Sequence, residues 1–148
     1  MKKYIYQIFT LLIVAIASSC ESYQIHGDLD GFWQVASIED KETGNVTQCK
    51  GDTYYSFQRD LVLLSYVSPN IPTGLIKENY IAYFSYNNDS IAMTDFRIYI
   101  DKDAPSVPLS KLKKFGLYAI FNTFYVEKLN KSFMILNSEK VRILMKKY

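Results

Sequence analysis

The sequence predicts an all-β protein: an eight-stranded antiparallel meander closed into a barrel, with one short helix between the fifth and sixth strands. Three observations support this fold class. Short runs of β-branched and aromatic residues alternate with turn residues along most of the chain, and the connections are short. Aromatic residues make up 16% and apolar residues 49% of the 148 residues, which is enough for one sizeable core. Closing the sheet removes the two unpaired edges that eight strands in an open sheet would leave.

Eight runs have the length and composition of β-strands. The clearest hairpin signal is Asn87-Asn88-Asp89 between the fourth and fifth runs, because Asn and Asp tolerate the left-handed backbone of a tight turn. Arg59-Asp60 is a similar polar break between the second and third runs. The predicted strands are residues 32–38, 53–58, 61–66, 80–86, 90–95, 123–129, 132–136 and 141–145.

Two segments depart from the strand pattern. Residues 68–74 contain two prolines and are predicted to form a loop, since proline cannot donate to a central ladder. Residues 108–116 are predicted to form the helix, with Gly116 as its C-terminal stop. Its apolar residues recur at every third position: Leu109, Leu112 and Phe115. The strand at 61–66 is apolar on both faces, so we expect another element, such as this helix, to cover its outer face.

The N-terminus has the features of an export signal. Lys2 and Lys3 precede an apolar run at residues 8–17, which is too short to cross a bilayer as a helix. Ala17-Ser18-Ser19-Cys20 then resembles a relaxed bacterial lipobox, in which small residues precede the cysteine that receives the lipid. The alternative is ordinary cleavage near Ser19, with Cys20 an incidental thiol.

This leader sets the expected domain organisation and location. We expect a signal peptide at 1–19, a lipidated polar tether at 20–29 and a barrel domain at 30–148. The membrane is then a partner through the lipid anchor on Cys20. We expect an outer-membrane lipoprotein of the cell envelope. Glu21 alone does not decide whether the protein faces the periplasm or the cell surface.

The composition excludes several classes of function. Lys2 and Lys3 account for the net charge of +2, so the rest of the chain is balanced and we expect no nucleic acid partner. One His and two Cys leave too few ligands for most metal sites, and we expect no metal or cofactor. Cys49 is interpreted as a packed or tolerated thiol, although the neighbouring Lys50 could favour the thiolate. His26 has no Ser or Cys nucleophile beside it, and no catalytic set can be assembled, so we expect no enzyme.

Gly31-Phe32-Trp33 at the start of the first predicted strand matches the Gly-x-Trp signature of lipocalins. From about Asp30 to Tyr148 the layout resembles the small lipocalin-like lipoproteins of Bacteroidota. The other shared features are Tyr55-Ser56-Phe57-Gln58, the helix end at 112–116 and the tail at 126–147.

The resemblance implies a structural role for the tryptophan. Trp33 would close one end of the barrel, and a basic residue from the last strand would pack on its ring. Arg142 is the residue carried over for this role, with Lys146 or Lys147 as alternatives. The alternative from the residues alone is that Trp33 is simply a core aromatic and Arg142 a solvated strand residue.

The resemblance also implies that the barrel holds a small apolar or amphipathic ligand. The candidate lining residues are Tyr55, Phe57, Phe84, Tyr86, Phe124 and Val126. The alternative is a structural or interaction lipoprotein whose filled barrel docks another envelope protein, because aromatic residues in strands more often belong to the core. An interior void of a few hundred Å³ would separate the two readings.

Overall fold

The computed structural model of the chain describes residues 24–68, 76–99 and 105–148. The predicted signal peptide, Cys20 and most of the predicted proline loop lie outside these residues. Within them, no helix is long and apolar enough to cross a membrane. The elements in chain order are η1 (Gly27–Leu29), β1 (Gly31–Asp40), β2 (Val46–Gln48), β3 (Thr53–Gln58), β4 (Leu61–Ser68), β5 (Ile76–Asn87), β6 (Ser90–Ile98), α2 (Leu109–Leu112), η2 (Lys113–Phe115), β7 (Asn122–Leu129), β8 (Phe133–Asn137) and β9 (Val141–Lys147).

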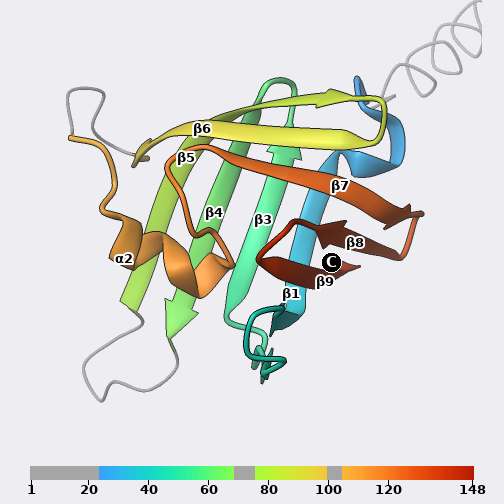
Figure 1. Cartoon of the computed structure of the whole chain (residues 1–148). Coiled ribbons are helices and arrows are strands. Elements are labelled where there is room, and N and C mark those ends of the chain that lie inside the picture. Colours follow the sequence, from blue (N-terminus) through green and yellow to red (C-terminus); the bar gives the residue numbers. More distant parts are fainter. Residues whose placement is uncertain (1–23, 69–75, 100–104) are drawn as a thin grey trace, which may run out of the picture.

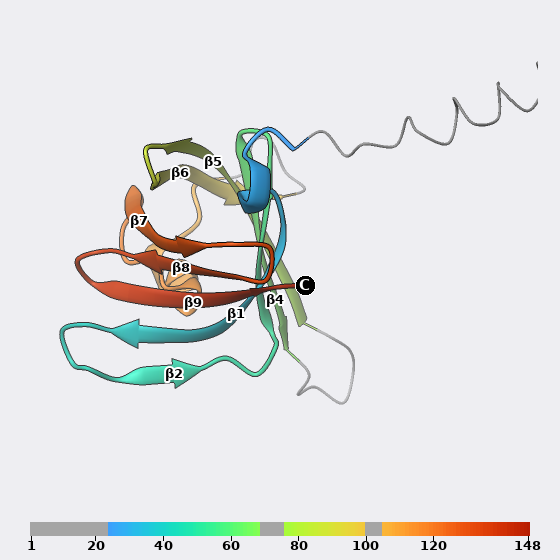
Figure 2. The same ribbon diagram turned by 90° about the vertical axis from the view of Figure 1, so that its right-hand side faces the viewer.

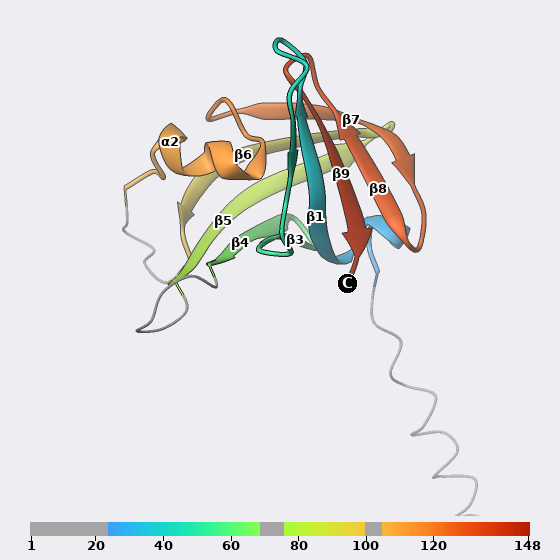
Figure 3. The ribbon, with the colours of Figure 1, turned by 90° about the horizontal axis from the view of Figure 1, so that it is seen from below.

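The strands form a closed antiparallel barrel, as predicted. Each of β3 to β8 pairs with the next strand in the chain, β1 pairs with β3, and β9 returns to pair with β1. Figures 1 and 3 show the barrel strands curving around one interior. The additional short strand β2 was not predicted. It pairs only with the second half of β1, from Ser37–Gln48 to Glu39–Val46, and so forms a hairpin on the edge of the barrel.

The up-and-down topology gives the barrel two distinct ends. The β3–β4, β5–β6 and β7–β8 turns lie with η1 and the end of β9 at one end, which we call the closed end. The β1–β2 hairpin, the β8–β9 turn and the α2–η2 helical segment lie at the other end, which we call the mouth. In Figure 1 the helical segment is on the left and η1 is on the right. Figure 2 shows the β1–β2 and β8–β9 connections side by side.

The turns follow the local sequence. Asn88 and Asp89 have φ angles of 48° and 58°, so two residues reverse the chain between the paired Asn87 and Ser90. This confirms the predicted hairpin. Gly116 has a φ of 79° and ends the helical segment, as predicted. A Cβ at this position would lie 2.8 Å from Ile143 Cδ1, so the close approach also requires glycine.

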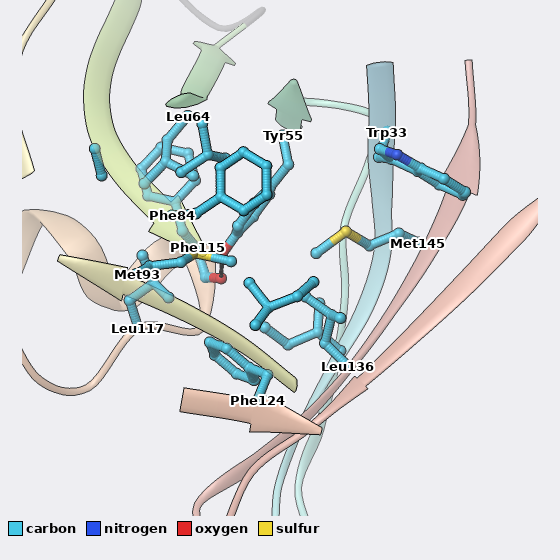
Figure 4. Close-up of a cluster of buried hydrophobic side chains, with 14 of the residues drawn as sticks. Trp33, Tyr55, Leu64, Phe84, Met93, Phe115, Leu117, Phe124, Leu136 and Met145 are labelled. Atoms are coloured by element: carbon cyan, nitrogen blue, oxygen red, sulfur yellow. Dashed lines mark hydrogen bonds between the residues drawn. The ribbon is translucent and has the colours of Figure 1, made fainter. Parts of the chain in front are cut away.

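One apolar core fills the barrel, and alternation along the strands builds it. In β3, Thr53, Tyr55 and Phe57 are buried, while their neighbours are half-buried or exposed. Figure 4 shows the inward side chains of several strands pointing toward one another. Each fully buried large apolar side chain contributes about 1.5–3 kcal/mol, so this core is the main source of stability.

The helical segment lies over the mouth of the barrel. Leu112, Phe115 and Leu117 are fully buried in the core. The expectation that this helix covers the outer face of the strand at 61–66 is therefore wrong. Leu61 and Leu63 on that face are only half-buried, because the apolar side of the helix is used to close the mouth.

Candidate functional site

The closed end is organised around Trp33, which is fully buried. Its indole Nε1 donates a 2.8 Å hydrogen bond to the Leu29 carbonyl. The Lys147 ammonium lies 4.4 Å from the ring centroid and donates hydrogen bonds of 2.7 and 2.5 Å to the carbonyls of Asp28 and Asp30. Partial burial holds the pKa of Lys147 below its ordinary value. Lys147 thus joins the last strand to the segment before β1.

Arg142 does not take this position, so the first choice for the residue packed on Trp33 is corrected to Lys147. Arg142 points outward, where its Nε and Nη2 each donate a 2.8 Å hydrogen bond to the Glu127 carboxylate. These hydrogen bonds hold the pKa of Glu127 below its ordinary value. The physical reason is alternation: Val141, Ile143 and Met145 of β9 are buried, which puts position 142 on the outer face.

The described part of the predicted tether belongs to the folded domain. Leu29 is fully buried. The His26 ring lies 5.2 Å from the Phe84 ring, and its Nε2 is 2.6 Å from the Arg59 carbonyl. The predicted boundary between tether and domain at position 29 therefore lies too far along the chain, because residues from His26 onward pack on the closed end of the barrel.

The predicted lining residues are packed against one another. Phe57 lies 5.1 Å from Phe84 and 6.0 Å from Tyr55, measured between ring centroids. Five of the six are buried in the core, and Tyr86 is half-buried. Figure 4 shows Tyr55, Phe84 and Phe124 among the side chains that fill the inside of the barrel. A ligand at this place would need the rings to move apart, so their role as lining residues stays a prediction.

Two polar contacts hold the helical segment over the mouth. The Tyr55 hydroxyl, inside the core, donates a 2.6 Å hydrogen bond to the Phe115 carbonyl, and burial holds the pKa of Tyr55 above its ordinary value. At the rim of the mouth, the part-buried Glu78 carboxylate accepts hydrogen bonds from Lys114 at 2.9 Å and from the Tyr80 hydroxyl. Burial alone would raise the pKa of Glu78, but these two donors outweigh it and lower the pKa.

An open groove of about 630 Å³ lies at the mouth, beside the end of the helical segment. We call it the mouth groove. Two of its aromatic side chains are largely exposed, with Phe121 at 58% and Tyr125 at 57%. Its lining combines aromatic, amide, hydroxyl and charged groups: Lys41, Gly116, Tyr118, Ala119, Phe121, Asn122, Thr123, Tyr125, Asn137, Ser138, Glu139, Lys140 and Val141.

Local hydrogen bonds fix the walls of the mouth groove. Asn122 accepts from the Tyr118 amide at 3.2 Å and donates to the Ala119 carbonyl at 2.6 Å, which shapes the loop that carries Phe121. Lys41 Nζ donates to the Ser138 carbonyl at 2.7 Å, so the opposite wall is also tied down. The groove is thus formed before any ligand enters.

One wall of the groove continues onto the outer face of the barrel. Tyr125 of β7 pairs in register with Asn137 of β8, which pairs with Arg142 of β9. Asn137 Nδ2 donates to Glu127 Oε2 at 3.4 Å, whereas Asn137 Oδ1 is shielded from water and has no hydrogen-bond partner. An aromatic ring, a free amide acceptor and an Arg–Glu ion pair therefore stand in adjacent positions.

Sequence reasoning did not identify the mouth groove, because the loop at 116–121 was not predicted to carry a site. A signal was present in the exposed pair Ile120-Phe121 next to Asn122, since adjacent large apolar residues in a connecting segment are unusual unless they are covered or used.

Three further hollows are present in the described parts of the chain. One of about 420 Å³ lies on the outer face of β4–β6, lined by Leu61, Tyr83 and Tyr99 among others. One of about 570 Å³ includes His26, Tyr86 and Val126, and one of about 270 Å³ includes Phe57. None of the three brings together the predicted lining residues.

No group of three or more His, Cys, Asp or Glu side chains that could hold a metal ion is found among the described residues. Cys49 is half-buried, and burial together with the charge of Asp52 raises the pKa of its thiol. These surroundings favour the protonated thiol over the thiolate that Lys50 could have promoted.

The closed meander, the buried tryptophan with a lysine on its ring, and the groove at the opposite end define a lipocalin-like β-barrel. The chain belongs to the lipocalin-like domain family, whose family model matches residues 13–148. This confirms the lipocalin-like part of the resemblance that rested on Gly31-Phe32-Trp33, while the lipoprotein part stays a prediction.

Two solved structures share the fold. A lipocalin-like protein from Bacteroides uniformis is 21% identical with a TM-score of 0.61, and an uncharacterized protein from Bacteroides eggerthii is 23% identical with a TM-score of 0.62. Each comparison covers 82% of this chain and 100% of the other chain. Among curated proteins, none matches the chain significantly.

Proposed function

We propose that this chain is a lipid-anchored, non-enzymatic protein of the cell envelope that binds a small amphipathic ligand in the mouth groove. The observation that carries the proposal is the groove itself, which places exposed rings beside polar groups in a volume of about 630 Å³. Small-molecule sites commonly occupy 300–1,000 Å³ and combine aromatic walls with a few fixed polar groups.

The lipid anchor would set the orientation of the groove. Cys20 is four residues from Gln24, where the described chain begins. At about 3.5 Å per extended residue, these four residues reach about 14 Å. The chain enters the barrel at the closed end. An acylated Cys20 would therefore hold the closed end near the bilayer and leave the mouth groove facing away from it.

The packed interior also supports a second candidate function, docking to another envelope protein. Tyr83 of β5, Ile98 at the end of β6 and the following Tyr99 are exposed at 52%, 46% and 55%, and all three line the hollow of about 420 Å³. Large exposed apolar side chains that gather on one face are common at protein interfaces. Cross-linking in cells through this face would capture one reproducible protein if docking is the function.

Ligand binding is tested by native mass spectrometry of the protein purified from its host. We expect an added mass that is lost in Tyr125→Ala and Phe121→Ala and retained in Tyr83→Ala, which removes an equally exposed ring on another wall. An added mass that survives both groove substitutions would place the ligand elsewhere, and a protein that carries no added mass would favour docking.

Anchoring is tested separately by metabolic labelling with a palmitate analogue. We expect the label on the wild type and on Cys49→Ser, and its complete loss with Cys20→Ser. The Cys49 variant is a matched control because it removes the other cysteine of the chain. Labelling that persists in Cys20→Ser would refute the anchor without bearing on the groove.

A further inference from the structure

We infer that the ligand class of the mouth groove is carbohydrate, bound through the Tyr125–Asn137 wall. The inference rests on the proposed function and names the chemistry of the same site. A pyranose ring has an apolar face of C–H groups and a rim of hydroxyls, so it needs a flat ring surface and closely spaced polar groups. The mouth groove offers both.

The ring surface comes from Phe121 and Tyr125. More than half of each side chain is exposed, although large aromatic side chains usually gain stability by burial. Both line the groove. A sugar that stacks on these rings would cover the apolar ring surface that the folded barrel leaves exposed to water.

The polar partners stand beside the rings. Asn137 is the cross-strand neighbour of Tyr125, and side chains that are directly opposite on one face lie about 5 Å apart. Asn137 Oδ1 has no hydrogen-bond partner and is covered from water, so a ligand hydroxyl that displaces the covering groups would give this oxygen the hydrogen bond it lacks. Thr123 is exposed at the start of β7, the strand that carries Tyr125, and offers a hydroxyl on the same wall of the groove.

The groove fits other ligand classes less well. A fatty acyl chain needs a site that buries most of its surface, whereas this groove is open and includes Lys41, Glu139 and Lys140. An anion needs a concentrated set of cationic groups, whereas Lys41 and Lys140 share this groove with Glu139, which offsets part of their charge. Uncharged hydroxyl groups suit such a mixed and nearly neutral lining.

The test is saturation-transfer difference NMR with the mature chain carrying Cys20→Ser. The probes are maltohexaose, cellohexaose, mannohexaose and chitohexaose at millimolar concentration, with dodecyl maltoside below its critical micelle concentration as an amphipathic control. We expect transfer to ring C–H protons of at least one sugar. Tyr125→Ala should weaken the affinity about fivefold to tenfold through the lost ring contact, and Asn137→Ala should also weaken it, while Tyr83→Ala should leave it unchanged.

Each outcome decides the inference. Absence of transfer from every sugar overturns it, and so does transfer that is unaffected by Tyr125→Ala. Transfer confined to the dodecyl chain of the detergent, and lost with Tyr125→Ala, overturns the sugar class but leaves ligand binding in the groove standing. A groove variant that fails to fold is recognised by altered Trp33 fluorescence, and Tyr125→Leu, which keeps bulk without a ring, then replaces it.

Discussion

Replacing Lys147 with methionine should destabilise the barrel at its closed end. Methionine keeps most of the length of the lysine side chain and removes the ammonium. That group contacts the Trp33 ring at 4.4 Å and donates to the carbonyls of Asp28 and Asp30. The substitution thus removes the polar link between β9 and the segment that precedes β1, while the apolar stem is kept.

The magnitude follows from these three contacts. A hydrogen bond from a charged donor contributes about 1.5–3 kcal/mol, and a cation on an aromatic face contributes about 0.5–2 kcal/mol. Lys147 is only half-buried, so water can replace part of each hydrogen bond. Removing the ammonium also removes the desolvation cost that lowers the pKa of Lys147, and this offsets part of the lost contacts. We therefore expect a loss of about 2 kcal/mol in the free energy of unfolding, or about 8 °C in Tm for a domain of this size.

Urea denaturation followed by tryptophan fluorescence measures this loss directly, because Trp33 is the single tryptophan of the chain. Lys146→Met is the matched control, since the Lys146 side chain is exposed on the same strand, and it should change stability by less than about 0.5 kcal/mol. If Lys147→Met were equally mild, the reasoning that this lysine ties β9 to the segment before β1 at the closed end would be refuted.

Three further substitutions address the helical segment at the mouth. Tyr55→Phe should cost about 1–3 kcal/mol of unfolding free energy in urea, because the buried Phe115 carbonyl loses its donor; an unchanged midpoint would contradict this. Phe115→Ala should cost about 3–5 kcal/mol through the cavity it leaves, and it should increase binding of a naphthylphenylamine dye, which the wild type should bind weakly if its interior is filled. For Glu78 the prediction concerns pH. Its pKa in the folded protein lies below the ordinary 4.5, so its contribution is complete above that pH and is lost as the pH falls through the folded pKa. Wild type should therefore lose more stability than Glu78→Gln between pH 5 and pH 3, and parallel losses would show that the Lys114 and Tyr80 contacts do not stabilise the fold.

Local sequence patterns predict most of the strands and turns of the barrel. Alternation in runs such as 53–58 fixes which side chains face inward, and Asn88-Asp89 fixes a two-residue turn. Both are short-range properties of the chain. The same alternation could also have identified the residue on Trp33, because the buried series Val141, Ile143 and Met145 continues inward to position 147.

Other features depend on contacts between distant segments, and local patterns do not contain them. The amphipathic pattern of the helical segment predicts that one of its faces is buried, but not against which part of the barrel. Its place over the mouth depends on the hydrogen bond from Tyr55, 60 residues before Phe115. Whether inward rings enclose a void or touch one another depends on the curvature of the barrel. The mouth groove likewise exists because the loop at 116–121 meets the β8–β9 turn.

The pairing of β1 with β9 also constrains how the chain acquires its structure. Trp33 and Lys147 are register partners, so the first barrel strand keeps one side unpaired until the ninth has been synthesised. Closure therefore waits for nearly the whole domain to be made. Until β9 has emerged, this side of β1 presents unpaired backbone groups to which another strand could pair.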